Sequence, residues 1–256
     1  MTAFFDAHLH IIDPRFPLVE NQGFLPKPFT CEDYRRKTAH FEVLGGAVVS
    51  GSFQHHDQSY LVDALRRLGP SFVGVTQLPH SVSDEALVRL DQQGVRGIRF
   101  NLHRGGSDDL SKLDAFARRV YELVGWHAEI YVDSKALAEI GSILRRLPAV
   151  SIDHLGLSTE GFDVLLSLVE KGVRVKATGF GRVDLDVRQA IRLIVSANPD
   201  ALMFGTDLPS TRARRPFHDG DLDLVADAVG DEALAEKVLF RNALDWYRIP
   251  GESTRR

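Results

Sequence analysis

Short runs of β-branched and apolar residues recur along the chain at roughly regular intervals, with longer polar stretches between them. Each run is four or five residues long and is bounded by polar or turn-forming residues, which is typical of strands buried in a sheet. The pattern therefore predicts eight strands, which are Phe4 to His8, Gly46 to Ser50, Phe72 to Thr76, Gly97 to Asn101, Glu129 to Val132, Val150 to Asp153, Val173 to Ala177 and Leu202 to Gly205.

Amphipathic stretches of helical period lie between most of these runs. An acidic residue such as Asp133 stands where a stretch begins, and glycine or proline follows where one ends, as at Gly125 and Pro148. A closing helix is predicted from Asp231 to Tyr247, with Asp231 as its cap. Another helix is predicted to begin at Ser83-Asp84-Glu85 and to end at Gly94. The other predicted helices are Ser59 to Leu68, Leu113 to Val124, Lys135 to Leu147, Phe162 to Lys171 and Val187 to Ser196.

Strands that alternate with helices indicate a parallel sheet whose strands are joined by crossover helices. Eight such units in 256 residues are typical of a (β/α)8 TIM barrel, so we predict that residues 1–256 form a single α/β domain of this fold. A doubly wound open sheet would instead carry a glycine-rich phosphate loop after its first strand. The segment from Ile11 to Pro28 is rich in proline and contains no such loop.

The composition is that of an ordinary globular protein, with 44% hydrophobic and 26% charged residues. A net charge of −4 gives no reason to expect a nucleic-acid or membrane partner, so we expect a small-molecule substrate. Cys31 is the only cysteine, which excludes an internal disulfide bond. With no signal-peptide pattern at the N-terminus, these features predict a cytoplasmic protein. The oligomeric state is not specified by the sequence.

Polar residues accumulate at the carboxyl ends of the predicted strands, which is where TIM barrels place their active sites. His8 and His10 are two positions apart on the first strand and would share one face. A His-x-His pair alone is typical of an alternating surface strand. Ala7 and Leu9 make the opposite face apolar, however, so we predict that Asp6, His8 and His10 point inward.

Two further candidates follow later strands. His154 comes directly after the sixth strand, and Asp207 comes after the eighth, shortly before Pro209. Each alone has a structural interpretation, as a hydrogen-bonded histidine and as a turn cap. With His8 and His10 they supply three nitrogen atoms and one carboxylate, which predicts either a metal shell or an acid-base cluster.

The mouth of the predicted barrel also carries positive charge. Alternation along the fourth strand places Arg99 and Asn101 inside the mouth, where an unpaired guanidinium costs several kcal/mol. Its partner is either an internal carboxylate, such as Asp6 or Asp133, or the carboxylate of a substrate. Tyr131, near the end of the fifth strand, is a candidate hydrogen-bond donor to substrate. We interpret residues 212–215 as a solvated loop, the alternative being a positive rim.

Several motifs together give the chain a family resemblance across its whole length. It resembles the amidohydrolase superfamily, specifically the amidohydrolase-related branch that includes 2-pyrone-4,6-dicarboxylate lactonase and sugar lactonases. The motifs are Phe5-Asp6-Ala7-His8-Leu9-His10 followed by Asp13 and Pro14, Gly97-Ile98-Arg99-Phe100-Asn101, Ile152-Asp153-His154-Leu155-Gly156, Lys176-Ala177-Thr178-Gly179-Phe180, Phe204-Gly205-Thr206-Asp207-Leu208-Pro209 and Arg241-Asn242-Ala243.

The resemblance implies a lactonase that opens the cyclic ester of a small carboxylated or polyhydroxylated metabolite. Asp207 would be the general base that activates water. The residues implied to surround the scissile carbonyl are His8, His10 and His154, and those implied to contact substrate are Ser50, Arg99 and Arg182. Two positions depart from the branch. Leu208 stands where tryptophan is common, and a second dicarboxylate-binding arginine would fall near Gly105, which argues against a pyrone dicarboxylate.

The resemblance also bears on cofactors. The bridging lysine of binuclear relatives has no counterpart at the end of the fourth strand, where Arg99 and Asn101 stand, and we expect catalysis without a metal. The alternative is one divalent ion, zinc, held by His8, His10, His154 and Asp207 in a mononuclear decarboxylase of a small aromatic or unsaturated acid. A third hypothesis is a catalytically silent barrel that only binds a ligand.

Overall fold

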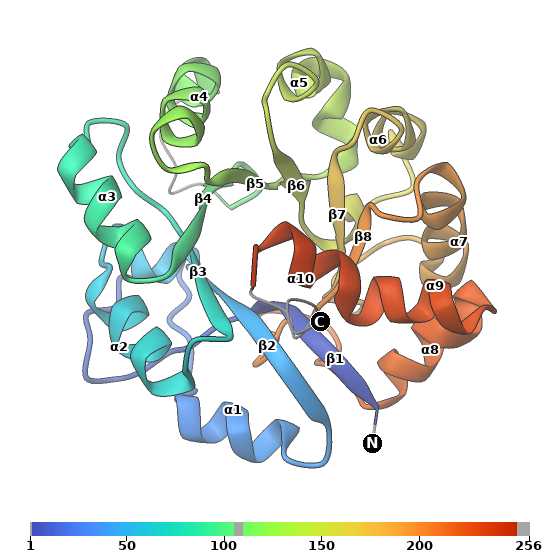
Figure 1. The fold of residues 1–256 in the computed structure, drawn as a ribbon, viewed down its shortest axis with the longest axis horizontal. Coiled ribbons are helices and arrows are strands. Elements are labelled where there is room, and N and C mark those ends of the chain that lie inside the picture. The colour runs from blue at the N-terminus through green and yellow to red at the C-terminus, as the bar shows by residue number, and fades with distance from the viewer. Residues whose placement is uncertain (1, 105–109, 250–256) are drawn as a thin grey trace, which may run out of the picture.

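The computed structural model describes residues 2–104 and 110–249, which build a nearly closed barrel of eight parallel strands (Figure 1). The strands are hydrogen-bonded in the order of the sequence, β1 to β8. All eight strands and the predicted (β/α)8 fold are confirmed. The strands are β1 (Ala3–Leu9), β2 (Glu42–Val49), β3 (Phe72–Thr76), β4 (Val95–Asn101), β5 (His127–Tyr131), β6 (Val150–Ile152), β7 (Arg174–Ala177) and β8 (Leu202–Phe204).

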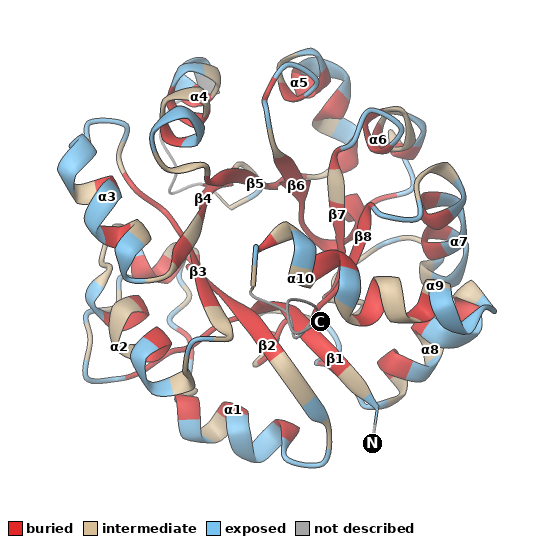
Figure 2. Cartoon of the chain, viewed as in Figure 1, coloured by how far each residue is buried: buried red, intermediate tan, exposed pale blue. Residues whose placement is uncertain are grey.

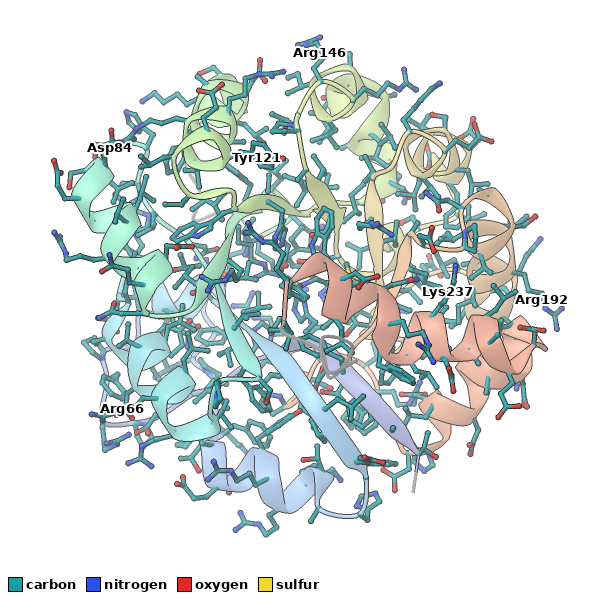
Figure 3. All side chains as sticks on the ribbon, viewed as in Figure 1. Arg66, Asp84, Tyr121, Arg146, Arg192 and Lys237 are labelled. Atoms are coloured by element: carbon teal, nitrogen blue, oxygen red, sulfur yellow. The ribbon has the colours of Figure 1, made fainter. Side chains whose placement is uncertain are left out.

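Helices surround the sheet and bury one face each against it, while their outer faces are exposed (Figure 2). Charged side chains such as Arg66 and Asp84 lie on the outside, and side chains fill the middle of the barrel (Figure 3). No helix in the described ranges has the length and apolar character to cross a membrane. The helices are α1 (Cys31–Thr38), α2 (Ser59–Leu68), α3 (Asp84–Gln92), α4 (Leu113–Val124), α5 (Leu137–Leu144), α6 (Phe162–Val169), α7 (Val187–Ala197), α8 (Gly220–Val229), α9 (Glu232–Glu236) and α10 (Asn242–Trp246).

The helices differ from the sequence prediction in two respects. Helices α1 and α8 were not predicted; α1 has only eight residues and is mostly charged, although Thr30 and Asp33 form a capping box at its start. The predicted closing helix is divided in three, because a π-helical turn at Lys237–Arg241 separates α9 from α10. Asp231 does cap it, accepting a hydrogen bond from the backbone of Leu234.

One half of the barrel interior is apolar, and helix α10 with Tyr247 closes the barrel on that side. Helix α10 crosses the centre of the barrel in Figure 1. The Tyr247 ring stacks on Phe5 at 5.6 Å between centroids, and its hydroxyl donates to the carbonyl of Ala7 at 3.3 Å. The apolar interior cluster comprises Phe5, Ala7, Ala47, Val49, Val73, Val75, Met203, Ala243 and Tyr247.

The prediction that Asp6 faces inward with the two histidines is wrong. The register between β1 and β2 shifts between Asp6 and Leu9, where β1 carries one extra residue. Alternation is broken there, so Asp6 points outward while His8 points inward. The Asp6 carboxylate accepts hydrogen bonds from the Tyr34 hydroxyl of α1 at 3.1 Å, and from the backbone nitrogen and hydroxyl of Thr206 at 2.8 and 2.6 Å.

Asp6 thereby ties the end of β8 to β1. Two backbone hydrogen bonds complete the closure, from the Asp207 nitrogen to the His8 carbonyl at 2.7 Å and from the His10 nitrogen to the Leu208 carbonyl at 2.8 Å. Burial raises the pKa of Asp6 to about 6, although the bonds from Thr206 oppose this rise.

Replacing Asp6 tests how much this closure contributes to stability. Asp6→Ala leaves the Thr206 and Tyr34 donors buried without an acceptor, so we expect the free energy of unfolding to fall by about 3 kcal/mol. Urea unfolding measures this loss. The control is Asp200→Ala, which removes an exposed pair with Lys237 and should cost less than about 1 kcal/mol. Equal losses in the two variants would contradict the role of Asp6.

Candidate active site

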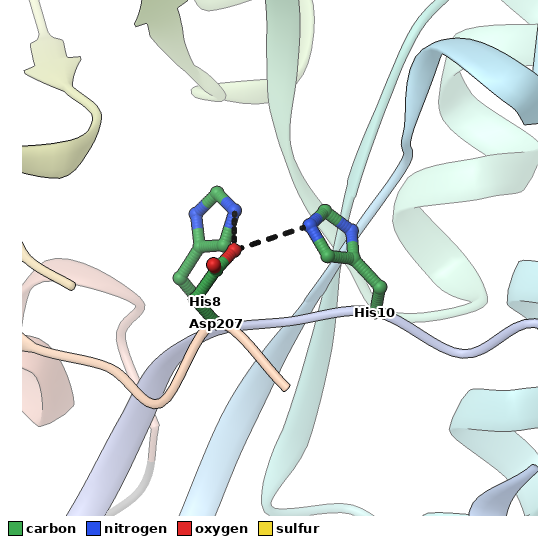
Figure 4. A group of neighbouring side chains, drawn as sticks. All are labelled: His8, His10 and Asp207. Atoms are coloured by element: carbon green, nitrogen blue, oxygen red, sulfur yellow. Dashed lines mark ion pairs between the residues drawn. The ribbon is translucent and has the colours of Figure 1, made fainter. Parts of the chain in front are cut away.

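The structure brings the four predicted site residues together at the carboxyl ends of the strands. His8 lies in β1, His10 just beyond it, His154 after β6 and Asp207 after β8. Asp207 Oδ1 is 4.0 Å from His8 Nε2 and 3.7 Å from His10 Nε2 (Figure 4). The His154 ring lies 4.9 Å from the His8 ring between centroids. All four side chains are buried.

The backbone at this site is built to let the side chains approach closely. Asp207 and His154 have φ angles of 59° and 50°, a left-handed conformation that residues other than glycine rarely adopt. A Cβ atom at Gly205 would lie 2.7 Å from the His8 nitrogen, and one at Gly179 would lie 2.6 Å from His154 Nδ1. Only glycine fits at these two positions.

Arg182 controls the charge of the carboxylate. Its Nε donates to Asp207 Oδ2 at 2.6 Å. Burial alone would raise the pKa of Asp207. The positive charge of Arg182 is the largest of several opposing interactions, which together hold this pKa well below its usual value. The other carboxylate oxygen, Oδ1, has no hydrogen-bond partner among the described residues, and neither has His8 Nε2. These two unpaired atoms face each other inside the site.

The histidines beside Asp207 differ in what they can offer to a ligand. Burial lowers the pKa of His8 well below its usual value and that of His154 to about 4, so both rings are neutral at pH 7. His10 Nδ1 lies 2.8 Å from the carbonyl oxygen of Val49. Because a carbonyl only accepts, Nδ1 of His10 carries a proton, and in the neutral ring Nε2 is an acceptor.

These atoms suit a divalent metal ion. Two sets of three ligand atoms lie close enough to hold one, formed by His8, His10 and Asp207 and by His8, Asp153 and His154. Neither set unites all four residues predicted as metal ligands. The unpaired His8 Nε2 and Asp207 Oδ1 are nonetheless the donor types that zinc prefers.

Arg99 pairs with an internal carboxylate, but not with Asp6 or Asp133 as the sequence suggests. Its Nη2 donates to Asp153 Oδ2 at 2.7 Å, and its Nε lies 3.5 Å from Glu129 Oε1. Asp133 instead caps the short turn after β5.

Lys176 lies beneath His8 in the barrel interior, where it is fully buried and donates to Glu129. Sequence reasoning assigned no role to Glu129 or Lys176. The signal was present, because each is a charged residue that alternates with apolar residues inside a buried strand.

The cavity above the histidines is lined by arginine, and no described residue that lines it is acidic. Arg104 and Arg212 line it in addition to Arg99 and Arg182. Of the predicted solvated loop 212–215, Arg214 and Arg215 are exposed, whereas Arg212 contributes to the cavity, as the alternative of a positive rim expects. Arg212 reaches the cavity over the Phe24 ring, with its Cζ 4.4 Å from the ring centroid. The cavity is lined by His10, Gly51, Ser52, Phe53, Arg99, Asn101, Arg104, Tyr131, His154, Arg182, Thr211 and Arg212.

The remaining predicted substrate contacts divide into two groups. Asn101 and Tyr131 line the cavity, where the Tyr131 ring lies 5.0 Å from that of His154. Ser50 is not among the lining residues, since its hydroxyl is bonded to the Tyr60 hydroxyl at 2.6 Å. Its substrate contact stays a prediction. Gly105, where a second arginine would fall, lies outside the described residues, but Arg104 next to it reaches the cavity.

The pairing of Arg182 with Asp207 can be tested without a substrate. Because Arg182 holds the pKa of Asp207 down, Arg182→Met should raise this pKa, so that the carboxyl group is protonated at higher pH. A carbon-13 NMR titration of the Asp207 carboxyl group measures the change. The matched control is Arg212→Met, on the same cavity but without a contact to Asp207. A similar shift in both variants would contradict the specific pairing.

The chain is similar to known proteins over most of their length. A 2-pyrone-4,6-dicarboxylate hydrolase of Comamonas testosteroni is 28% identical, over 94% of this chain and 89% of the relative. A 4-sulfomuconolactone hydrolase of Hydrogenophaga intermedia is 26% identical, over 93% of this chain and 86% of the relative.

Solved structures give the same fold. A crystal structure from Acinetobacter baumannii, named a probable 2-pyrone-4,6-dicarboxylic acid hydrolase and holding citric acid, superposes with a TM-score of 0.84. It is 22% identical, with 96% of this chain and 99% of that chain covered. The model of the family described as amidohydrolase matches residues 5–249. The chain belongs to the amidohydrolase family.

Proposed function

We propose that this protein is a hydrolase that opens the lactone ring of a small anionic metabolite, with Asp207 as the base that activates water. The observation that carries the proposal is the unpaired Asp207 Oδ1, which lies beside His8 and His10. Asp207 and His8 are fully buried, and His10 and Arg182, which contact Asp207, line the arginine-rich cavity. The relatives named as hydrolases of a pyrone dicarboxylate and of a sulfomuconolactone support a cyclic ester as the substrate.

The attacking water lies between Asp207 Oδ1 and His10 Nε2 in this proposal. Both atoms are acceptors, so together they orient the two hydrogen atoms of one water molecule. Asp207 takes one proton as the water oxygen attacks the lactone carbonyl. The negative charge that develops on the carbonyl oxygen needs donors, and the neutral rings of His8 and His154 are close enough to supply them.

Ring opening completes the reaction. The bond between the carbonyl carbon and the ring oxygen breaks, and Asp207 returns its proton to the departing oxygen. The product is an open-chain acid with a hydroxyl group, or the corresponding ketone if the ring oxygen was enolic. Arg182 leaves one carboxylate oxygen of Asp207 free, so it can hold the side chain in place throughout.

The charges around the cavity support an anionic substrate. Arg99 and Arg182 are neutralised by Asp153 and Asp207, whereas Arg104 and Arg212 add positive charge to the cavity. We propose that these last two hold acidic groups of the substrate remote from the lactone carbonyl. Arg104 removes the objection that no second arginine is available near Gly105.

A balance of charge supports catalysis without a metal. Three carboxylates below the cavity face three cations, as Asp207 with Arg182, Asp153 with Arg99 and Glu129 with Lys176. A divalent ion would add uncompensated positive charge to this buried site. Amidohydrolases often use a metal, however, and either His8, His10 and Asp207 or His8, Asp153 and His154 would hold it here. It would polarise a carbonyl and lower the pKa of bound water, or bind a carboxylate in the alternative zinc decarboxylase.

We also propose that the protein is cytoplasmic. Proteins of oxidising compartments commonly contain disulfide bonds, whereas the single cysteine of this chain, Cys31, is buried as a free thiol.

Replacing Asp207 tests the function. Proton release is measured on a panel of aromatic-degradation and sugar lactones, with and without a chelator. Asp207→Asn should lower kcat by at least about a hundredfold on any lactone that the wild type opens, because the base is removed while the shape is kept. Added chelator should leave the wild-type rate unchanged.

Two outcomes would contradict this proposal. Lactone opening lost with chelator and restored by zinc would contradict catalysis without a metal, and zinc-dependent release of carbon dioxide from small unsaturated acids would favour the decarboxylase. Unchanged ligand affinity in Asp207→Asn, with no turnover of any lactone by the wild type, would favour a silent barrel.

Replacing the arginines tests the charge of the substrate. Arg104→Met and Arg212→Met should each raise KM for an acidic lactone by about tenfold, or about 1.4 kcal/mol, and leave kcat nearly unchanged. The same variants should have little effect on a neutral lactone. Arg214→Met is the matched control, because Arg214 is exposed and does not line the cavity. Equal effects on acidic and neutral lactones would contradict the assignment.

A further inference from the structure

A group of four charged side chains lies directly beneath the catalytic histidines, inside the half of the barrel that is not apolar. Lys176, Glu129 and Asp153 have no exposed surface, and Arg99 is 4% exposed. They come from β7, β5, the end of β6 and β4, and they hold two positive and two negative charges. Such a group is expensive to bury, so a role beyond filling space is expected of it.

The ring of His8 lies between Asp207 and the three fully buried members of this group, while Arg99 also lines the cavity. Its Nε2 faces Asp207, whereas its Nδ1 faces downward. Three atoms surround Nδ1, with Lys176 Nζ and Asp153 Oδ1 both at 3.4 Å and Glu129 Oε1 at 3.7 Å. A neutral imidazole carries one proton, and the partner of Nδ1 decides which nitrogen holds it.

The two possible partners give His8 opposite roles. If Lys176 donates to Nδ1, the proton is on Nε2 and the ring offers a hydrogen-bond donor beside Asp207. If Nδ1 donates to Asp153, Nε2 presents a bare lone pair, which suits a metal ion but cannot stabilise an oxyanion.

The contacts favour Lys176. Its ammonium group has three N–H donors and no acceptor; one N–H reaches Glu129, and a second is available to His8 Nδ1. Asp153 Oδ1 lies at the same distance from Nδ1, but this contact lacks the geometry of a hydrogen bond, since Oδ1 accepts none from a described residue. Glu129 Oε1 is also without a hydrogen bond in the described part of the chain.

We propose that Lys176 is a positioning residue that donates to His8 Nδ1 and so keeps the proton of the neutral ring on Nε2, the nitrogen that faces Asp207. Glu129 holds the ammonium group in place. His8 is then a donor, while His10, whose Nδ1 is bonded to the Val49 carbonyl, is an acceptor. The effect of this difference on catalysis rests on the proposed lactone hydrolysis, but the tautomer itself does not.

The tautomer is measured directly by nitrogen-15 NMR of protein labelled in its histidine rings, at pH 7 and without substrate. Protonated and bare ring nitrogens differ in chemical shift, and the His8 signals are assigned by their loss in His8→Asn. We expect the wild type to carry the proton on Nε2.

Two variants then remove the donor. Lys176→Met combined with Glu129→Leu deletes one charge of each sign and keeps the volume, so the barrel should stay folded, as circular dichroism will check. In this double variant the proton of His8 should move to Nδ1, facing Asp153. Lys176→Met alone should move the proton in the same way, but it should also lower the stability of the protein, because Glu129 is left buried without its partner. The double variant should lose about a hundredfold in kcat with KM nearly unchanged, as when one oxyanion donor is removed.

The results separate this proposal from the proposed function. A wild-type proton on Nδ1, or a double variant that keeps its proton on Nε2, would overturn it. A shifted proton with unchanged kcat would also overturn it, because the tautomer would then not matter for the reaction. If the tautomer shifts as expected but the wild type opens no lactone, the positioning by Lys176 stands and the proposed function fails.

Discussion

The hydrogen bonds that join β1 to β8 are the constraint on which the rest of the structure depends. His8 and Asp207 lie near opposite ends of the sequence, and they meet only because the first and last strands are held side by side. The buried Asp6 carboxylate does this from outside the barrel, through the backbone and hydroxyl of Thr206. Backbone hydrogen bonds between residues 8–10 and residues 207–208 then fix the positions of the His8 and Asp207 side chains relative to each other.

Charge balance explains how so many ionised groups tolerate burial in one place. Each carboxylate beneath the cavity contacts a cation, and the neutral rings of His8 and His154 add no charge. The charges at the floor of the site therefore cancel. The rim carries net positive charge, since Arg104 and Arg212 face the cavity there. An incoming anion therefore meets attraction at the entrance rather than at the reacting atoms.

Alternation and motif spacing were sufficient to predict the eight strands and the meeting of three histidines with Asp207, because these features are local or follow from the barrel itself. Asp6 was misplaced since a single extra residue in β1 reverses alternation, and nothing in the sequence marks that insertion. Lys176 was missed because its partners come from other strands. Arg212 depended on the path of a loop, and α1 was too short and too charged to show helical periodicity.

The floor of the barrel comes from the segment around Tyr247, which packs on Phe5 and reaches the backbone of Ala7 in the first strand. This segment leaves the ribosome after all eight strands have been made. The Tyr247 ring also lies 5.8 Å from Lys176 Nζ, so the buried charges beneath His8 gain this cover only when the end of the chain has been synthesised.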